Sequence, residues 1–287
     1  MDFSIVIPTY ADNERLNLCL QHLESQVTTA SFEVIVVNNS FENPVELGKV
    51  YTLDLKLIEE FRTGSYAARN AGIAVAKGKI LGFTDSDCKP SPDWIQTAFK
   101  HFIDHPNTFR LSGTVRLESQ APLSPPGIYQ KLFDFDQENN YFLGVSVTAN
   151  FFTPKESFES VGYFNNDLVS GGDFEWNQRA KDLKLDHNPS VIVYHPLKPM
   201  KTHLRSVRRN YSYEYELQKS KGNSSLLVLG SLRLLFPRKT RYKQIITRDC
   251  YKGWYLTLGL LAYEYLLRIH HFAEHWRLFF GGNPVSR

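Results

Sequence analysis

An alternation of short apolar runs with helical segments constrains the fold of this chain more than any other feature of its sequence. Runs rich in Val, Ile, Leu and Phe occupy residues 3–7, 33–37, 55–58 and 79–83. Three of these runs are nearly continuous, which is typical of strands that are buried on both faces of a parallel sheet. The first third of the chain therefore predicts a sheet covered by helices on both sides.

Helical patterns lie between these runs. Leu16, Leu20 and Leu23 recur with the spacing of one helix face, and the Ala-rich segment 65–78 ends at a glycine, as helices often do. The resulting β-α-β-α-β order predicts an α/β fold with a mainly parallel, right-handedly connected sheet. With 287 residues and 42% hydrophobic content, the chain is long enough for one large α/β domain or a domain with an appendage.

Beyond residue 105 the pattern is less regular. We expect strands at 109–118, 145–152 and 190–194, helices at 154–161 and 173–184, and a Pro-rich loop at 120–127. A boundary is predicted near residues 195–201, where prolines coincide with a switch in charge. Residues 198–287 carry 17 Lys and Arg against 5 Asp and Glu, whereas the residues before them carry 16 against 25.

The basic C-terminal part predicts an anionic partner. Nucleic acid, anionic lipid and a phosphorylated ligand all fit such a charge. No recognisable nucleic-acid-binding module is present, so we expect no nucleic-acid partner. The three cysteines lack metal-ligand spacing, and the start MDFSIVIPTY lacks the basic region and cleavage site of a signal peptide. We therefore expect a cytoplasmic protein, peripheral at the inner face of the cell membrane if the basic part binds lipid.

Polar residues follow three of the predicted strands. In open parallel sheets, ligands bind beyond the carboxyl ends of the strands. The polar residues at those ends are Tyr10, Asp12 and Glu14, then Asn38 and Asn39, then Asp85 and Asp87. We expect separate stretches of the sequence to converge there on one rim of the sheet.

The two aspartates in KILGFTDSDCKPSPDWI have two interpretations. Asp and Ser favour turns, so Asp85 and Asp87 by themselves are consistent with a solvated loop. At the end of a parallel strand, two carboxylates also suit Mg²⁺ or Mn²⁺, ions that usually keep waters and bind a substrate's phosphate oxygens. The second interpretation requires a ligand that carries phosphates.

Four segments, in order along the chain, resemble those of a known family: SIVIPTYADNERLNLCLQHL, GSYAARNAGIAVAKGKILGFTDSDCKPSPDWI, VTANFFTPKESFESVGYFN and SGGDFEWNQRAKDL. Through them the chain resembles the inverting glycosyltransferases of family 2, which have the GT-A fold, over roughly residues 1–215. The resemblance implies a catalytic domain at 1–200, with a nucleotide-binding half at 1–105 and an acceptor half at 106–200. A basic, aromatic-rich helical region follows at 201–287.

The resemblance also implies a donor site. Its expected donor-binding residues are Pro8, Tyr10, Glu14, Asn38, Arg69 and Asp85. Asn38 occupies the position of a family aspartate that accepts a hydrogen bond from the base, and an amide oxygen can still accept one, without charge assistance. An Arg on an Ala-rich helix also often serves the helix alone, which is the alternative for Arg69. The expected donor is a nucleoside diphosphate sugar, with UDP as the expected nucleotide.

The expected metal ligands are Asp87, Asp85 and His195. Asp87 matches the family residue that binds Mn²⁺ or Mg²⁺ directly, and Asp85 the one that reaches the ribose or the waters on the metal. The cation would neutralise the leaving diphosphate. A lone histidine is more often an ordinary surface or core residue, so this alternative remains for His195.

Asp173 in GGDFEWNQR matches the family's catalytic base, which takes the proton of the acceptor hydroxyl. The family more often has Glu before this aspartate, whereas this chain has Gly172, so Glu175 is a candidate substitute. An N-cap role for Asp173 is the alternative, and both roles are compatible. The stretch WNQRAKD lacks the Gln-x-x-Arg-Trp motif of processive members, which predicts transfer of one or a few sugars.

Segments 224–236 and 253–280 are apolar and aromatic, interrupted by Arg233, Glu264 and Arg268. Neither has the ~20 uninterrupted apolar residues of a spanning helix. With their flanking cations, they suit adsorption to an anionic membrane surface. The alternative is a pair of ordinary helices that pack on the catalytic domain or on a second subunit of a homodimer.

These expectations together predict a metal-dependent glycosyltransferase of the hexosyltransferase type. Its acceptor would be a saccharide or a lipid-linked saccharide, in bacterial-type cell-surface polysaccharide or glycolipid biosynthesis. One alternative is a catalytically impaired sugar-nucleotide-binding scaffold in a polysaccharide-assembly complex. Another is a sugar-phosphate nucleotidyltransferase, which would need a Gly-rich, basic loop where this sequence has IPTYADNER.

Overall fold

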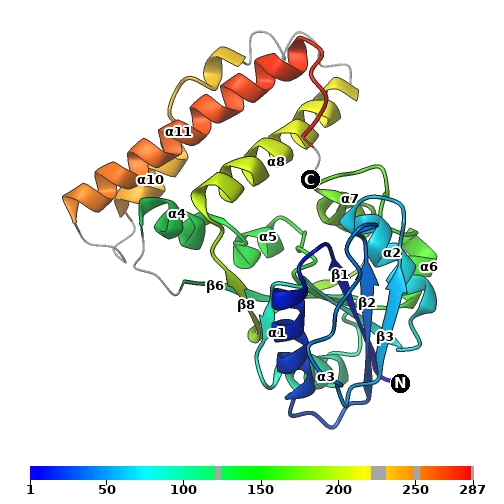
Figure 1. Cartoon of the computed structure of the whole chain (residues 1–287). Coiled ribbons are helices and arrows are strands. Elements are labelled where there is room, and N and C mark those ends of the chain that lie inside the picture. Colours follow the sequence, from blue (N-terminus) through cyan, green and yellow to red (C-terminus); the bar gives the residue numbers. More distant parts are fainter. Residues whose placement is uncertain (120–123, 221–230, 248–252, 286–287) are drawn as a thin grey trace. The chain divides into compact units, whose positions relative to one another are not determined.

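The structure is a computed structural model that describes residues 1–119, 124–220, 231–247 and 253–285. The chain divides into two compact units (Figure 1). The first comprises residues 1–118, 135–168 and 172–196, and the second comprises residues 119–134, 169–171 and 197–287. Parts of two predicted segments, residues 120–123 and 224–230, lie outside the described residues.

The first unit is built on a mixed, mainly parallel sheet. Its strands are β1 (Phe3–Thr9), β2 (Phe32–Asn38), β3 (Leu55–Glu59), β4 (Ile80–Thr84), β5 (Lys89–Pro90), β6 (Arg110–Glu118), β7 (Asn150–Pro154) and β8 (Leu185–Pro196). In the described part of the chain they lie in the order β3-β2-β1-β4-β7-β6-β8-β5. The first four in this order are parallel, as predicted, whereas β7 is antiparallel to both β4 and β6.

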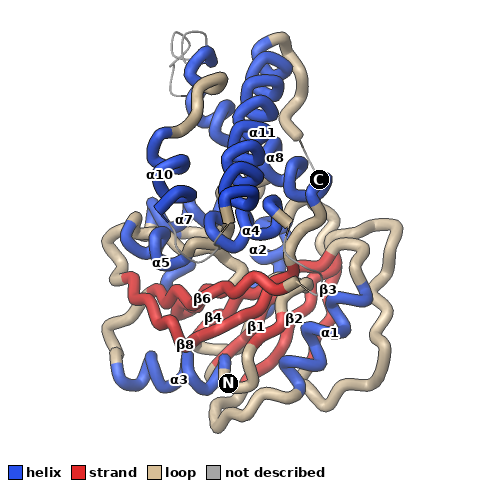
Figure 2. Tube along the Cα trace, turned by 90° about the vertical axis from the view of Figure 1, so that its left-hand side faces the viewer, coloured by secondary structure: helices blue, strands red, loops and turns tan. Residues whose placement is uncertain are grey.

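Two apolar layers cover opposite faces of the sheet because successive strand residues point to opposite sides. Ile5 and Ile7 of β1 belong to a core shared with α1 (Asn13–Glu24) and α3 (Trp94–Asp104). Val6, between them, belongs to the core on the other face, with α2 (Ser65–Val75). Figure 2 shows α1 and α3 on one face of the sheet. Burial on both sides explains the nearly continuous apolar runs.

Helix α2 packs closely on β1 because of one glycine. A Cβ added at Gly72 would lie 2.4 Å from Cγ1 of Val6, which is closer than two non-bonded carbon atoms can approach. Residues three apart lie on the same side of a helix, so this close packing also fixes the position of Arg69 beside the strands.

The strand predicted at 145–152 is shorter in the structure, where β7 begins only at Asn150. Side chains from elsewhere bind the preceding backbone groups. The carbonyl of Ser146 accepts a hydrogen bond from Asn177, and the N–H of Val147 donates one to Gln137. These groups are therefore not available to a neighbouring strand, and residues 145–149 form an irregular loop.

Other differences concern short elements. The predicted loop at 120–127 gives way at residue 125 to helix α4 (Pro125–Phe133), whose first positions are prolines, a favoured place for this residue. Helix α5 (Gln137–Phe142) and strand β5 were not predicted. The predicted helices at 154–161 and 173–184 are present but shorter, as α6 (Glu156–Val161) and α7 (Gly172–Arg179).

The second unit is helical. It contains α4, α8 (Met200–Ser220), α10 (Lys239–Thr247) and α11 (Trp254–Phe279). Its apolar core joins Ile128 of α4, Ile245 of α10, and Leu260 and Leu267 of α11. Helix α11 lies along α8 in both views (Figures 1 and 2). Among the described residues, we find no helix with the length and apolar character that crossing a bilayer requires.

Candidate active site

The ends of several strands meet at one edge of the sheet in the first unit. Thr9 at the end of β1 pairs with Asn38 at the end of β2. Thr84 at the end of β4 pairs with Asn150, the first residue of antiparallel β7. Strands β4 and β6 both run antiparallel to β7, and β8 runs parallel to β6, so β8 ends at the same edge as β4. The topology therefore brings together the residues that follow β1, β2, β4 and β8.

Four potential metal-ligand side chains gather beyond β4 and β8. Asp85, Asp87, Cys88 and His195 each place one ligand atom within 4.8 Å of the others. The turn after β4 is closed by the N–H of Cys88, which donates to the carbonyl of Asp85 at 3.0 Å. This turn brings the two carboxylates onto the same side as the end of β8.

His195 is held with one ring nitrogen facing Asp87. Its Nδ1 lies 2.7 Å from the carbonyl oxygen of Pro196, which can only accept, so Nδ1 carries the proton. The ring packs against Phe135 with 4.6 Å between ring centroids, and only 3% of the residue is exposed. Its Nε2 lies 3.4 Å from Oδ1 of Asp87. A histidine held in this way keeps Nε2 directed toward the carboxylate and available as a metal ligand.

This set of donors fits a divalent cation. Carboxylate oxygens suit Mg²⁺ and Mn²⁺, and an imidazole nitrogen shifts the preference toward the transition metal. Cys88 adds a softer donor, but burial and the neighbouring carboxylates raise the pKa of its thiol, which keeps it protonated at neutral pH. The fit therefore depends chiefly on Asp85, Asp87 and His195.

Arg69 of α2 lies behind the acidic pair. Its Nη2 donates to Oδ1 of Asp85 across 2.5 Å, and only 4% of the residue is exposed. The guanidinium also lies over the ring of Tyr66, 5.6 Å from its centroid. Because Arg69 is buried and bonded to Asp85, it does not serve its helix alone, which was the alternative interpretation. It orients one carboxylate of the cluster.

Asp173 lies in the first turn of α7 and is held by three donors. Its carboxylate accepts hydrogen bonds from the N–H of Phe174 at 3.0 Å, the hydroxyl of Tyr66 at 3.2 Å and the N–H of Thr148 at 3.4 Å. Burial raises the pKa of Asp173 above its ordinary value, while the charge of Arg69 and these three donors oppose the rise. A carboxylate with a raised pKa is a stronger proton acceptor.

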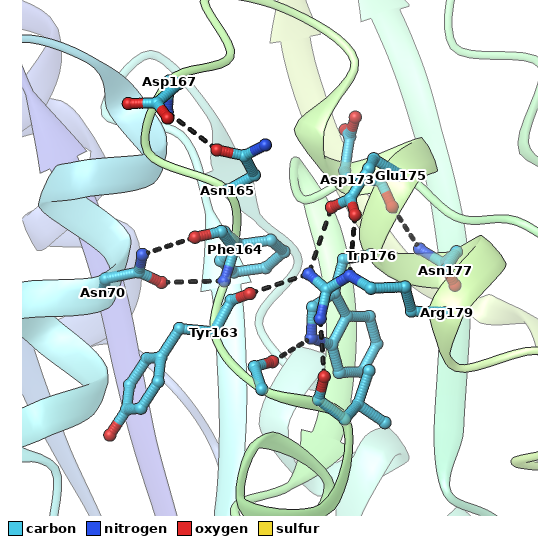
Figure 3. A network of polar contacts seen from close by, with 12 residues as sticks. Asn70, Tyr163, Phe164, Asn165, Asp167, Asp173, Glu175, Trp176, Asn177 and Arg179 are labelled. Carbon is cyan, nitrogen blue, oxygen red and sulfur yellow. Dashed lines mark hydrogen bonds and ion pairs between the residues drawn. The ribbon is translucent and has the colours of Figure 1, made fainter.

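Glu175, on the same helix, has a different role. It pairs with Arg179, Nε to Oε1, at 2.7 Å, and Arg179 also donates to the carbonyls of Val161 at 2.6 Å and Tyr163 at 2.7 Å (Figure 3). This network ties α7 to the end of α6 and to the segment that follows it. The carboxylate of Glu175 is therefore engaged in a structural contact.

The expected base-pocket residues lie at the ends of β1 and β2. Pro8 is buried within β1, Tyr10 is half exposed just after it, and Glu14 is exposed in the first turn of α1. Asn38 is buried and donates to the carbonyls of Ser40 and Asn43, while its own oxygen accepts from the N–H of Ser40. Its amide thus shapes the loop after β2.

Three residues that contact the candidate site were not predicted. Arg15 places Nη1 3.5 Å from Oδ2 of Asp87 and Nε 2.6 Å from Asp12. Its position one residue after Glu14 was the available signal. Tyr66 and Thr148 hold Asp173, and no spacing in the sequence indicates either contact, because each residue lies far from Asp173 along the chain.

Sequence comparisons agree with this geometry. The Glycosyl transferase family 2 model matches residues 4–159. Over 206 residues the chain is 32% identical to the glycosyltransferase AglE of Haloferax volcanii, a match that covers 68% of this chain and 67% of that protein.

Solved structures show the same fold. S. aureus TarS 1-349 in complex with UDP-GlcNAc has a TM-score of 0.55 at 15% identity, covering 98% of this chain and 93% of that one. The mannosyltransferase PcManGT from Pyrobaculum calidifontis, in complex with GDP-Man and Mn²⁺, has a TM-score of 0.54 at 18% identity, covering 99% and 76%. The expected GT-A-like architecture is confirmed.

Proposed function

This chain belongs to glycosyltransferase family 2, and from that premise we propose that it moves a sugar from a nucleoside diphosphate donor to an acceptor hydroxyl by a single inverting displacement. The observation that carries the proposal is the position of Arg69. It bonds to Asp85 of the acidic cluster, and its charge lowers the pKa of Asp173. One buried cation thus links the proposed metal site to the proposed base.

Asp87, Asp85 and His195 are the proposed metal ligands, and Mn²⁺ or Mg²⁺ is the proposed ion. When bound, the ion supplies positive charge that stabilises the leaving diphosphate. Asp85, oriented by Arg69, is proposed to reach the ribose or the waters on the ion. Arg15, which already contacts Asp87, adds a cation on the side of α1.

Asp173 is the proposed general base. It takes the proton of the acceptor hydroxyl as that oxygen forms a bond to the anomeric carbon, while the bond from this carbon to the diphosphate oxygen breaks. The electron pair of the broken bond leaves with the diphosphate. Attack from the opposite face inverts the anomeric centre. The three hydrogen bonds to Asp173 aim its carboxylate before the acceptor arrives.

The donor is proposed to be a UDP-sugar, bound by Pro8, Tyr10, Glu14, Asn38 and Arg69. TarS was solved with UDP-GlcNAc, and PcManGT with GDP-Man, so the fold accommodates more than one base. Asn38 is proposed to offer the second lone pair of its amide oxygen to the base, because one is already used by Ser40. The loop after β2 would then read the base.

For the acceptor, we propose a saccharide or lipid-linked saccharide in cell-surface polysaccharide or glycolipid assembly, with the protein in the cytoplasm at the inner face of the membrane. The basic second unit supports this choice, since lipid-linked acceptors are held at a membrane surface. A donor-binding scaffold without transfer is the second candidate. It is favoured by Gly172, which stands where relatives more often have an acidic residue.

One assay separates these two candidates. The chain is incubated with a panel of nucleotide sugars with and without Mn²⁺, and slow release of the nucleoside diphosphate to water is followed. An enzyme hydrolyses its own donor with metal and loses this activity in Asp87→Asn. A scaffold binds the donor in calorimetry and releases nothing, which would contradict the proposed transfer.

A further inference from the structure

Helix α11 places its charged side chains toward the interior of the second unit. Glu264 is fully buried, where it accepts from Arg238 at 2.8 Å and from the hydroxyl of Tyr129 at 2.5 Å. Arg268, also buried, donates to the carbonyl of Arg233 at 2.6 Å. The helix thus satisfies these two charges by contacts with its neighbours in the unit.

The next buried carboxylate on α11 is paired in the same way. Glu274 is 1% exposed and accepts from Arg208 at 2.8 Å, from Ser212 at 2.8 Å and from Arg277 at 2.5 Å. These contacts hold its pKa at about 2, well below the ordinary value, although burial alone would raise it. Both acidic residues of α11 are therefore paired with arginines inside the unit.

The outward face of α11 is apolar along its length. Residues at helical spacings of three and four recur on it: Trp254, Leu258, Ala262, Tyr265, Ile269 and Ala273, all exposed. Trp254 is 77% exposed, and Phe280, just beyond the other end, is 79% exposed. With a rise of ~1.5 Å per residue, the stripe from Trp254 to Ala273 extends over ~29 Å. A helix facing water has the reverse arrangement, with its charges outward.

The charges that reach solvent in residues 231–247, next to α11 in sequence and in contact with it through α10, are positive. Arg233, Lys239 and Lys243 are exposed, beside exposed Phe236 and Ile246. Within residues 231–247 and 253–285, the acidic residues are Glu264 and Glu274, both buried. The described surface of these two segments is therefore apolar and cationic.

We propose that this face of the second unit, defined by Trp254, Leu258, Tyr265 and Ile269 with Lys239 and Lys243, binds flat on an anionic lipid bilayer. An apolar stripe with an aromatic residue near each end and flanking cations is the surface that interfacial helices bury at the headgroup boundary. Each cation near an anionic leaflet adds to the attraction. Charges directed into the protein and apolar groups directed outward are what a lipid environment selects.

Charge complementarity selects lipid over a second copy of the chain. In a two-fold dimer through this face, Lys239 and Lys243 would meet no exposed acid from residues 231–247 or 253–285 of the other protomer. An anionic bilayer neutralises the same cations. The inference concerns binding at the membrane and is independent of which residues perform transfer.

The test is co-sedimentation of the full chain with vesicles of phosphatidylcholine alone and of phosphatidylcholine with phosphatidylglycerol. We expect binding to the anionic vesicles that weakens as salt is raised. Leu258→Ser with Ile269→Ser should reduce the partition coefficient by tenfold or more, and Lys239→Glu with Lys243→Glu by about tenfold. The matched control is Val27→Ser with Ile103→Ser, two exposed apolar residues of the first unit, which should bind as the wild type does.

A second readout follows the emission of Trp254. Trp94 and Trp176 are fully buried, so a blue shift on adding anionic vesicles reports on the two tryptophans of α11, exposed Trp254 and half-buried Trp276, and Trp254→Phe should reduce it. Donor hydrolysis without vesicles should be unchanged in all of these variants, which separates membrane binding from catalysis. Absence of binding to anionic vesicles, or equal binding by the serine variant, would overturn the proposal. A wild-type dimer that Ile269→Ser dissociates would also overturn it, in favour of a self-interface.

Discussion

Arg69 and Asp85 form a hydrogen-bonded ion pair of 2.5 Å, in which the arginine is buried and the aspartate lies at the edge of the candidate site. The contact joins helix α2 to the turn that follows β4. It also identifies a role for Arg69 that no motif in the sequence assigns, namely the orientation of an aspartate. The first prediction follows from this pair.

Replacing Arg69 by Met should destabilise the fold by about 1–3 kcal/mol, because Asp85 loses a charged hydrogen bond. It should also weaken donor binding, since Asp85 loses its orientation. Urea unfolding and calorimetric titration with UDP and Mn²⁺ measure the two effects. The matched control is Arg62→Met, which breaks the exposed pair with Asp167 and should cost at most about 1 kcal/mol. Equal costs for the two variants would contradict the assigned role.

Asp173→Asn should retain donor affinity and lose transfer by about 10²–10⁴-fold, since an amide cannot accept the hydroxyl proton. Donor affinity is measured by calorimetry, and transfer by release of UDP in the presence of acceptor. Glu175→Gln, two residues away on the same helix, is the control. Its carboxylate pairs with Arg179, so this variant should retain transfer. Wild-type turnover by Asp173→Asn would remove Asp173 from the proposed role.

The rate of transfer should rise with pH as Asp173 loses its proton, with a midpoint above the ordinary value of 3.8 because burial raises its pKa. Tyr66→Phe removes a donor that lowers this pKa. The variant should therefore shift the acidic limb of the profile to higher pH. A profile that shifts to lower pH, or does not move, would show that the tyrosine does not act on the titrating group.

The contribution of Asp173 to the stability of the fold should fall as pH rises, whereas the rate of transfer rises. A carboxyl group whose pKa is raised by folding binds its proton more tightly in the native state, so its contribution to stability is lost as pH rises from 3.8 through the raised value. Asp173→Asn should thus raise the melting temperature at neutral pH. The difference from the wild type should vanish below the ordinary pKa. Thermal unfolding followed by circular dichroism across this pH range measures it.

Asp87→Asn should abolish the dependence of UDP binding on Mn²⁺, because it removes the proposed direct ligand. Calorimetric titration of UDP with and without Mn²⁺ provides the measurement. Asp167→Asn, an exposed aspartate that is 81% accessible, should behave as the wild type does. Metal-dependent binding that survives in Asp87→Asn would place the cation elsewhere.

The sheet was largely predictable because its signal is local. Runs such as FSIVI carry alternate residues to two cores, Ile5 and Ile7 to one and Val6 to the other, so continuous apolar character indicates a strand covered on both faces. The edge of the sheet that carries the candidate site was predictable because parallel strands end at a common edge.

The loop at 145–149 was not predictable. Its apolar and β-branched residues favour a strand, but Gln137 and Asn177 bind its backbone, and Thr148 donates to Asp173. These contacts form between residues 10 to 31 positions apart. Tertiary hydrogen bonds outweigh local propensity there, and the same bonds position the proposed base.

The orientation of α11 was equally hidden. The sequence of this largely apolar helix does not indicate whether its few charged residues face inward or outward. Arg238 and Arg208, from distant segments, settle the question by pairing with Glu264 and Glu274. Glu264 and Arg268, which interrupt the apolar segment along the sequence, are thus buried in the second unit.

The shared position of Arg69 has a consequence for attempts to redesign this enzyme. Substitutions introduced around Asp85 to alter donor choice, and others introduced around Asp173 to admit new acceptors, act on one guanidinium. Their effects should depart from simple addition, as expected for residues in one network. Libraries that vary the residues around Asp85 and those around Asp173 at the same time will therefore include active combinations that are lost when the two sets are selected one after the other.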